Sequence, residues 1–397
     1  MRLLALYRDA YTGLPREVWI LSLVLFINRC GSMVLGFLVL YLTTERGYTM
    51  PTAGNILAVY GFGALIGIGL GGYLVDRIGY RRVQIGSMYL AGAGFVGFSF
   101  LESSSAILGG ALFLGAAAES FRPANGTAVA AFTPPALRSR AYALNRLALN
   151  LGYTVGPALG GLLAEFSYAW LFWIDGATCA LAGLSLAVLL PASSAEREFR
   201  EPRANTPKSR SPWRDGVFLL AFVFLLLQCL VFFQLQSTYS HYLVEGRGYS
   251  KLVFGLVLAF NATIVVLCEM PLIRSLEGRH PLRLMAVASV LVGLGFGLLP
   301  LSGSLIWISM LALLWTLGEM LASPTMSSWV ATRAAPENRG AYMAAFGIAF
   351  SLGFAGGPWI GTRIYEYYGP EPLWWSCLGV GTFAGAGFLL LARYSAR

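Results

Sequence analysis

Ionisable side chains lie inside several long apolar runs of this sequence. Glu119 and Arg122 lie three residues apart in one run, Arg29 and Arg146 lie in two others, and Glu319 lies midway along a fourth. If these runs cross a lipid bilayer, each ionised side chain near its centre costs about 2.5–3.5 kcal/mol, so such residues usually have a function. Their available chemistry is proton uptake and release by a carboxylate, and binding of an anionic group by a guanidinium.

Glu119 and Arg122 share one face of a helix, where an ion pair would offset part of the cost of burying them. One interpretation is a purely structural pair. In the other, Glu119 takes up and releases a proton, and Arg122 binds a substrate or displaces that proton. A carboxylate's pKa rises on desolvation and falls beside an arginine, so a movement between two states would switch its protonation.

A wider set of residues completes the predicted site. Glu119 and Glu319 are the candidate proton-coupling residues. The candidate substrate-binding residues are Arg29, Arg122, Arg146, Phe233 and Gln234. Aromatic side chains such as Phe233 suit adaptable apolar sites, although in membrane helices they more often pack in the core or face lipid.

The elements that must position these residues are membrane helices. Hydrophobic residues make up 57% of the chain and charged residues 12%, against roughly 45–50% apolar residues in soluble domains. A span needs roughly 20 apolar residues, and hydropathy predicts about twelve such spans. They lie near 18–43, 52–75, 82–101, 106–131, 140–165, 169–191, 216–243, 251–276, 281–302, 304–331, 340–366 and 371–394.

The net charge of +9 comes from basic residues that gather on one side of these spans. The opposite side carries only Arg46, Arg247 and Lys251 among the loops. This is the positive-inside bias, which predicts an integral inner-membrane protein with both termini in the cytoplasm and argues against a nucleic-acid partner. The N-terminal residues lack a cleavage-site pattern, so no removable signal peptide is expected.

Cysteine and histidine usage argues against a metal site or a disulfide framework. The five cysteines fall in apolar spans without a CxxC pair, and the two histidines form no HExxH pattern. No GxxxxGK[ST] motif for ATP occurs either. We therefore expect no metal, no cofactor and no enzymatic activity, with a proton gradient as the energy source.

The chain contains an internal repeat with an offset of 201 residues. Arg46-Gly47-Tyr48 aligns with Arg247-Gly248-Tyr249, and Gly156-Pro157 aligns with Gly357-Pro358. An even number of spans in each half predicts parallel repeats around a central site, with alternating access to it. The predicted fold is all-α, with six-helix bundles at 1–193 and 215–397 and a polar, basic linker at 194–214.

The predicted loop between the second and third spans, GYLVDRIGYRRV (72–83), resembles the signature of the major facilitator superfamily. The matching residues are Gly72, Leu74, Asp76, Arg77, Gly79 and Arg81, and the departure is Tyr80, where the family usually has a basic residue. The resemblance implies a conformational latch between Asp76 and the N-terminal end of span 11, since a helix N-terminus attracts a carboxylate. Glu277 and Arg283 are a weaker copy in the second half. Arginines that only set the topology are the alternative.

The stretch NLGYTVGPALGG (150–161) in span 5 looks like the motif of the superfamily's drug:proton antiporters. Its glycines favour close helix packing, and its proline removes a backbone hydrogen bond. The motif residues are Gly152, Gly156, Pro157, Gly160 and Gly161. A partial copy in span 11 leaves general helix packing as the alternative.

A second resemblance involves the proton-dependent oligopeptide transporters. Arg29, Arg122 followed by Pro123, and Glu319 look similar to the residues that hold the two ends of a peptide in that family. The two acids that precede its span-1 arginine are Leu25 and Asn28 here.

These patterns predict a monomeric secondary transporter whose partners are protons, the bilayer and a small-molecule substrate. The first hypothesis is proton-coupled export of small, largely apolar organic molecules. The second is proton-coupled or facilitative transport of peptides or other zwitterionic or anionic solutes. A sensor or structural membrane protein without transport is a third.

Overall fold

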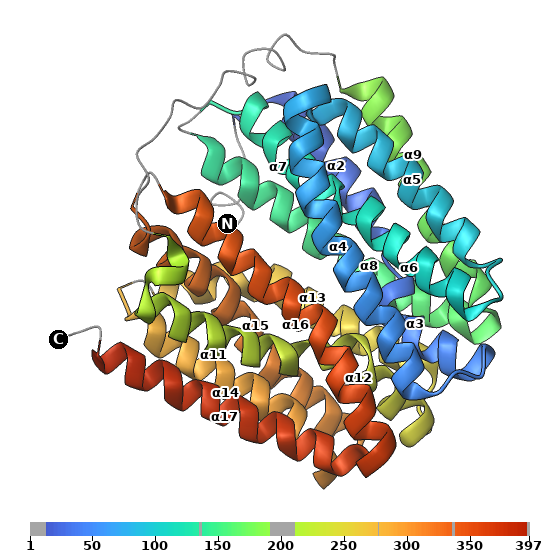
Figure 1. Cartoon of the computed structure of the whole chain (residues 1–397), viewed down its shortest axis with the longest axis vertical. Coiled ribbons are helices and arrows are strands. Elements are labelled where there is room, and N and C mark those ends of the chain that lie inside the picture. The colour runs from blue at the N-terminus through green and yellow to red at the C-terminus, as the bar shows by residue number, and fades with distance from the viewer. Residues whose placement is uncertain (1–12, 135–136, 191–210, 277, 336–337, 395–397) are drawn as a thin grey trace, which may run out of the picture. The chain divides into compact units, whose positions relative to one another are not determined.

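The computed structural model describes residues 13–134, 137–190, 211–276, 278–335 and 338–394, and over these residues it is all-helical (Figure 1). The predicted linker lies mostly outside the described residues. The first half contains α2 (Arg16–Cys30), α3 (Val34–Leu40), a π-helical turn (Tyr41–Glu45), α4 (Met50–Ile78), α5 (Tyr80–Phe98), α6 (Ser104–Glu119), α7 (Phe121–Phe132), α8 (Arg138–Phe166) and α9 (Ala169–Leu189).

The second half repeats this series. It contains α11 (Gly216–Phe232), a 3₁₀ turn (Phe233–Gln236), α12 (Thr238–His241), a π-helical turn (Tyr242–Gly246), α13 (Lys251–Ser275), α14 (Pro281–Gly297), a 3₁₀ turn (Leu299–Leu301), α15 (Leu305–Arg333), α16 (Arg339–Tyr368) and α17 (Pro370–Tyr394).

Helices occupy every predicted span. Among the described residues, 11 helical segments are long and apolar enough to cross a membrane. The remaining predicted span, near 82–101, corresponds to α5, whose second and third residues are arginines and which packs against α6, α7 and α9. Three predicted spans each consist of consecutive helices: α2 with α3, α6 with α7, and α11 with α12.

The two halves use the same helix pairings, as a repeated fold requires. In the first half α2 packs on α8 and α9, and α5 packs on α6 and α9. The corresponding helices of the second half repeat all four contacts: α11 packs on α16 and α17, and α14 packs on α15 and α17. The repeat seen in the sequence is therefore a repeat of packing.

Local contacts follow the same offset of 201 residues. The guanidinium Nε of Arg46 donates to the hydroxyl of Tyr41 at 2.6 Å, and that of Arg247 donates to the hydroxyl of Tyr242 at 2.9 Å. Each arginine also lies over the ring of its tyrosine. The π-helical turn between tyrosine and arginine brings the two side chains together in both halves.

The helices form two compact units, and each unit includes a segment from the other half. The described residues within Met1–Val34, Phe62–Pro202 and Lys251–Thr263 form one unit, and those within Leu35–Gly61, Arg203–Ser250 and Ile264–Arg397 form the other. The start of α4 thus belongs with the second half, and the start of α13, its repeat partner, belongs with the first. The bundle boundaries predicted from the sequence remain a prediction.

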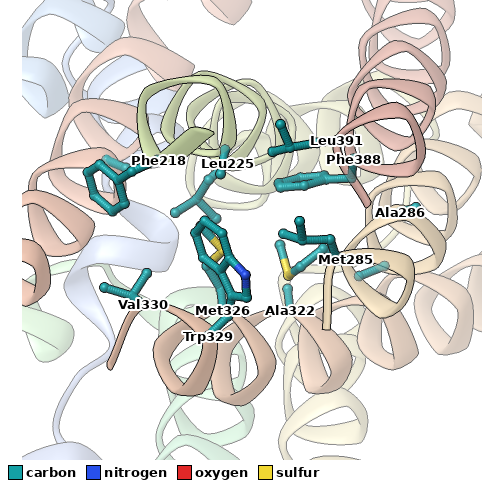
Figure 2. Packing of buried hydrophobic residues seen from close by; sticks show 14 of the residues in the cluster. Phe218, Leu225, Met285, Ala286, Ala322, Met326, Trp329, Val330, Phe388 and Leu391 are labelled. Atoms are coloured by element: carbon teal, nitrogen blue, oxygen red, sulfur yellow. The ribbon is translucent and has the colours of Figure 1, made fainter. Parts of the chain in front are cut away.

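A cluster of buried apolar side chains packs α11, α14, α15, α16 and α17 together (Figure 2). Phe218 and Leu225 of α11, Met285 of α14, Met326 of α15 and Phe388 of α17 are all buried there. Helices in lipid associate through van der Waals packing rather than through escape from water. The stability of this core therefore depends on how closely its side chains fit.

Asp215 connects three helices at the start of α11. Its carboxylate accepts hydrogen bonds from the backbone amide of Phe218 at 3.1 Å and from the hydroxyl of Tyr342 at 3.0 Å. It also accepts hydrogen bonds from Nη2 and Nε of Arg333 at 2.6 and 2.7 Å. Burial raises the pKa of Asp215, but the hydrogen bonds from Arg333, Phe218 and Tyr342 outweigh it, so its pKa lies below the usual value for aspartate. The ionised carboxylate therefore contributes to folding.

We expect Asp215→Asn to lower the melting temperature of the purified protein at pH 7, because the amide still caps the helix but loses the ion pair with Arg333, worth about 0.2–1 kcal/mol. The folded-state pKa is depressed, so this stability is present above an unfolded pKa of about 3.9 and is lost as pH falls through the lower folded value. The gap between the two proteins should therefore shrink below about pH 4. A gap that stays constant down to pH 2 would mean that the charge of Asp215 contributes nothing.

Candidate functional site

Arg29 lies in the last turn of α2 and points toward α8. Its Nη1 donates to the hydroxyl of Tyr153 at 3.3 Å, and the guanidinium carbon lies 5.6 Å from the centre of that ring. The residue is half-buried. A guanidinium held against an aromatic ring is suited to binding a carboxylate or phosphate.

Glycines of α8 make the close approach to Arg29 possible. A Cβ added to Gly152 would collide with Cβ of Arg29, and one added to Gly156 would lie 2.9 Å from the Arg29 carbonyl oxygen. In the second half, a Cβ on Gly353 would collide with Cβ of Cys229, and one on Gly357 would lie 3.0 Å from the Leu230 carbonyl oxygen. This motif therefore packs span 5 on span 1 and span 11 on span 7 alike.

The rest of the span-5 motif faces the start of α13. The carbonyl oxygen of Pro157 would collide with a Cβ on Gly255, and a Cβ on Gly161 would lie 2.6 Å from the Lys251 carbonyl oxygen. Gly160 is buried. Residues of the motif thus serve two different helix contacts.

Glu119 and Arg122 form the predicted ion pair. Oε2 of Glu119 lies 2.9 Å from Nη2 of Arg122, and the side chains are 14% and 66% exposed, respectively. Glu119 ends α6, and the single residue Ser120 separates it from α7. Oε2 itself is screened from solvent and, despite the short distance, lacks the geometry of a hydrogen bond. The pair therefore joins a shielded carboxylate to an accessible guanidinium.

The remaining predicted charges are half-buried. Arg146 lies in the first half of α8, and Glu319 lies in the middle of α15. Both have interactions with neighbouring groups.

Phe233 and Gln234 lie in the 3₁₀ turn that follows α11. The ring of Phe233 contacts Phe354 of α16, with the ring centres 5.2 Å apart. Gln234 is buried, and its amide donates to the carbonyls of Leu230 and Gly357 and accepts from the hydroxyl of Thr238. Its polar atoms thus serve the packing of α11 against α16, and its predicted substrate role stays a prediction.

The predicted latch loop joins α4 to α5 through Gly79, whose φ of 90° favours glycine. Arg81 donates to the carbonyls of Ala187 and Leu190 at 2.7 and 3.1 Å and so caps the end of α9. Tyr80, the departure from the family signature, is buried with its ring against Phe132. These residues fix the start of α5.

The other latch residues are more exposed. Asp76 is exposed at the end of α4, and Arg77 lies over the ring of Tyr73. Gly72 has open space around its Cα, and Arg283 is exposed in the first turn of α14. Glu277, which with Arg283 is the predicted weaker copy of the latch, lies outside the described residues.

Sequence reasoning missed Asp175 in α9. This aspartate is 1% exposed, and its carboxylate accepts the backbone amides of Met33 and Val34 at 3.0–3.2 Å. The sequence did contain a signal for it: Asp175 is an ionisable side chain inside the apolar sixth span, which is the criterion that singled out Glu119.

A buried amide chain was also missed. Gln84 donates to Asn125 at 3.3 Å, Asn125 donates to Asn145 at 2.8 Å, and Asn145 donates to Ser22 at 3.5 Å. All four side chains are buried, and they come from α5, α7, α8 and α2. Uncharged amides inside membrane helices were the signal here, because lipid leaves them no other partner.

Comparison with known proteins identifies the family. A model of the Major Facilitator Superfamily matches residues 21–358. The chain belongs to this superfamily. It is therefore a transporter chain with the predicted all-α membrane fold, and not an enzyme.

Several relatives share most of their length with this chain. It is 26% identical to the uncharacterized MFS-type transporter YqjV of Bacillus subtilis, with 93% of this chain and 91% of the relative aligned. It is also 26% identical to a Na(+), Li(+), K(+)/H(+) antiporter of Planococcus maritimus, covering 92% of each chain. The multidrug resistance protein MdtH of Aeromonas hydrophila is 26% identical over 82% of this chain and 81% of its own.

Solved structures share the fold at lower identity. A POT family transporter in complex with 5-aminolevulinic acid superposes with a TM-score of 0.82 at 16% identity, covering 98% of both chains. The likeness extends over the whole transporter fold.

We expect Gly152→Ala to destabilise the transporter, although alanine is the better helix former by about 1 kcal/mol. The added methyl group would collide with Arg29, and such overpacking typically costs about 1–3 kcal/mol. Gly86→Ala in α5 is the matched control, because open space surrounds that glycine. Equal melting temperatures of the two purified variants would rule out the close contact between α8 and α2.

Proposed function

We propose that this chain is a proton-coupled antiporter that exports small, largely apolar organic molecules by alternating access. The observation that carries the proposal is the shielded Glu119 carboxylate, 2.9 Å from the accessible guanidinium of Arg122. Desolvation and a nearby cation act on a carboxylate's pKa in opposite directions. Separating the two groups would favour proton uptake, and bringing them together would favour release.

Aromatic side chains support an apolar substrate. Successive ring contacts run from Tyr60 through Phe354, Phe233 and Phe232 to Trp315, with ring centres 5.2–6.3 Å apart. Phe232, Phe233 and Phe354 are only partly buried. Such rings bind apolar molecules without demanding particular hydrogen bonds.

In each unit, hydrogen bonds hold the segment that comes from the other half of the sequence. Lys251 of α13 donates to the carbonyl of Ala164 at 2.9 Å, and Glu165 of α8 accepts the amide of Leu252 at 3.1 Å. Arg363 of α16 likewise donates to Asn55 of α4 at 2.9 Å. Each contact lies within one unit and joins residues from the two halves of the sequence, so alternating access would move each unit together with the segment it holds.

The names of two relatives support antiport and drug export. One is named a Na(+), Li(+), K(+)/H(+) antiporter, and another a multidrug resistance protein. We extend antiport and drug export to this chain as a proposal. The proposal also includes a proton gradient as the energy source, a monomeric protein in the inner membrane, and both termini in the cytoplasm.

A second candidate is transport of zwitterionic or anionic solutes such as peptides. Arg29, held against Tyr153, supports it, because a half-buried guanidinium in a membrane helix is suited to binding an anionic group. Dipeptide accumulation without dye export in proteoliposomes would favour this candidate, and absence of any flux would favour a sensor.

We expect Glu119→Gln to reduce pH-driven dye transport in proteoliposomes to the level of protein-free vesicles, because an amide cannot carry the proton. Dye exchange at equal pH should continue. Glu102→Gln, at an exposed acid before α6, is the control and should transport normally. Undiminished pH-driven transport by Glu119→Gln would remove Glu119 from the coupling mechanism.

We expect Asp76→Asn to lower the maximum transport rate while leaving the KM for the dye unchanged. The proposed latch is a carboxylate at a helix N-terminus, worth about 0.3–2 kcal/mol, which corresponds to about two- to thirtyfold in rate. Asp76→Glu, which keeps the charge, should retain more of the rate. If Asp76→Asn changed only the KM, the latch assignment would be wrong.

A further inference from the structure

Span 1 is interrupted directly after Arg29. Helix α2 ends at Cys30, and α3 begins at Val34. Within the interruption the carbonyl of Arg29 accepts the amide of Ser32 at 3.1 Å. The direction of the Arg29 side chain therefore depends on what holds this interruption in place.

Asp175 of α9 holds it from one side. Oδ1 accepts the amide of Met33 at 3.1 Å, and Oδ2 accepts the amides of Met33 and Val34 at 3.2 and 3.0 Å. Lipid offers no substitute partner for a freed backbone amide, so these contacts are needed wherever a membrane helix is broken.

The fit between α9 and the interruption is close. A Cβ on Gly31 would collide with the hydroxyl of Thr178, one turn beyond Asp175. That hydroxyl is itself fixed by the carbonyls of Ile174 and Asp175 at 2.9 and 3.1 Å. Asp175 and the interruption thus form one packed unit, with Arg29 at its edge.

In the second half, a neutral side chain connects the interrupted span to its neighbour. Span 7 is interrupted at the equivalent place, after Phe232. There the neutral side chain of Gln234 bonds to Gly357 of α16, and the residue equivalent to Asp175 is the exposed Ser376. An interruption therefore does not by itself require a carboxylate.

In the first half, an acid (Asp175) and an arginine (Arg29) occur together at the interruption. The equivalent positions of the second half hold neither an acid nor an arginine. The equivalent of Arg29 is Leu230. The amide of Asn28, the residue before Arg29, donates to the thiol of Cys179, one turn beyond Asp175, at 3.3 Å, so both residues lie where α2 and α9 pack together. Asp175 therefore occurs together with Arg29, whereas the interrupted span of the second half has neither residue type at the equivalent positions.

We propose that Asp175 is a positioning residue for Arg29, and that the two together make a subsite for an anionic group, such as a carboxylate, of the transported molecule. The inference rests on the proposed substrate-binding role of Arg29. Asp175 itself does not touch the substrate, because both its oxygens face the amides of span 1 and the side chain is buried.

The test is equilibrium binding of fluorescein, an anionic probe, and ethidium, a cationic one, to the full-length purified transporter. Asp175→Ala should raise the Kd for fluorescein about tenfold, the size of one lost charge-assisted hydrogen bond. Its Kd for ethidium should stay the same. Asp175→Asn keeps an acceptor for Met33 and Val34, so it should bind fluorescein close to normally. Ser376→Ala is the matched control.

A double variant shows whether Asp175 acts through Arg29. Arg29→Gln with Asp175→Ala should bind fluorescein no more weakly than Arg29→Gln alone. Additive losses, equal losses in Asp175→Asn and Asp175→Ala, or a wild-type protein that binds ethidium but not fluorescein would each overturn the proposal.

Two further readouts separate this inference from the proposed function. Hydrogen exchange of the segment 28–36 should accelerate in Asp175→Ala and not in Asp175→Asn; unchanged exchange in both would overturn the positioning role. Normal fluorescein binding with no pH-driven flux would instead refute the proton-coupled antiport and leave the Asp175 subsite standing.

Discussion

Backbone amides exposed by a broken membrane helix must find partners inside the protein, because lipid supplies none. The first and seventh spans are both broken at the same place in the repeat. Asp175 supplies the partner in the first case, and an amide from Gln234 ties the second break to α16. Either bond requires the neighbouring helix to approach the break closely.

Glycine makes that approach possible. Gly152 and Gly156 in α8, and Gly353 and Gly357 in α16, bring their helices against the spans that are broken. Any side chain at these positions would push the helices apart. The same glycines that looked like a signature of antiporters therefore serve packing in both halves.

On this shared scaffold the two halves carry different chemistry. The first half contains the buried chain of Gln84, Asn125 and Asn145. The equivalent residues of the second half are Met285, Met326 and Phe346, and Met285 and Met326 fill the apolar core (Figure 2). Arg29 and Asp175 likewise have the uncharged counterparts Leu230 and Ser376. The repeat therefore preserves the helix packing, while the polar or charged side chains at these positions of the first half are replaced in the second half.

The sequence by itself determined the membrane class, the positions of the spans, the internal repeat and the superfamily, because each depends on local composition, periodicity or motif. It also paired Glu119 with Arg122, which lie three residues apart across the junction of α6 and α7. Only the tertiary structure decided that Asp175 contacts the break in span 1, more than a hundred residues away. It also decided that the side chain of Gln234 hydrogen-bonds to the backbone of α16. Hydropathy shows that a helix crosses the membrane, but not where it breaks or which neighbour satisfies the amides that the break exposes.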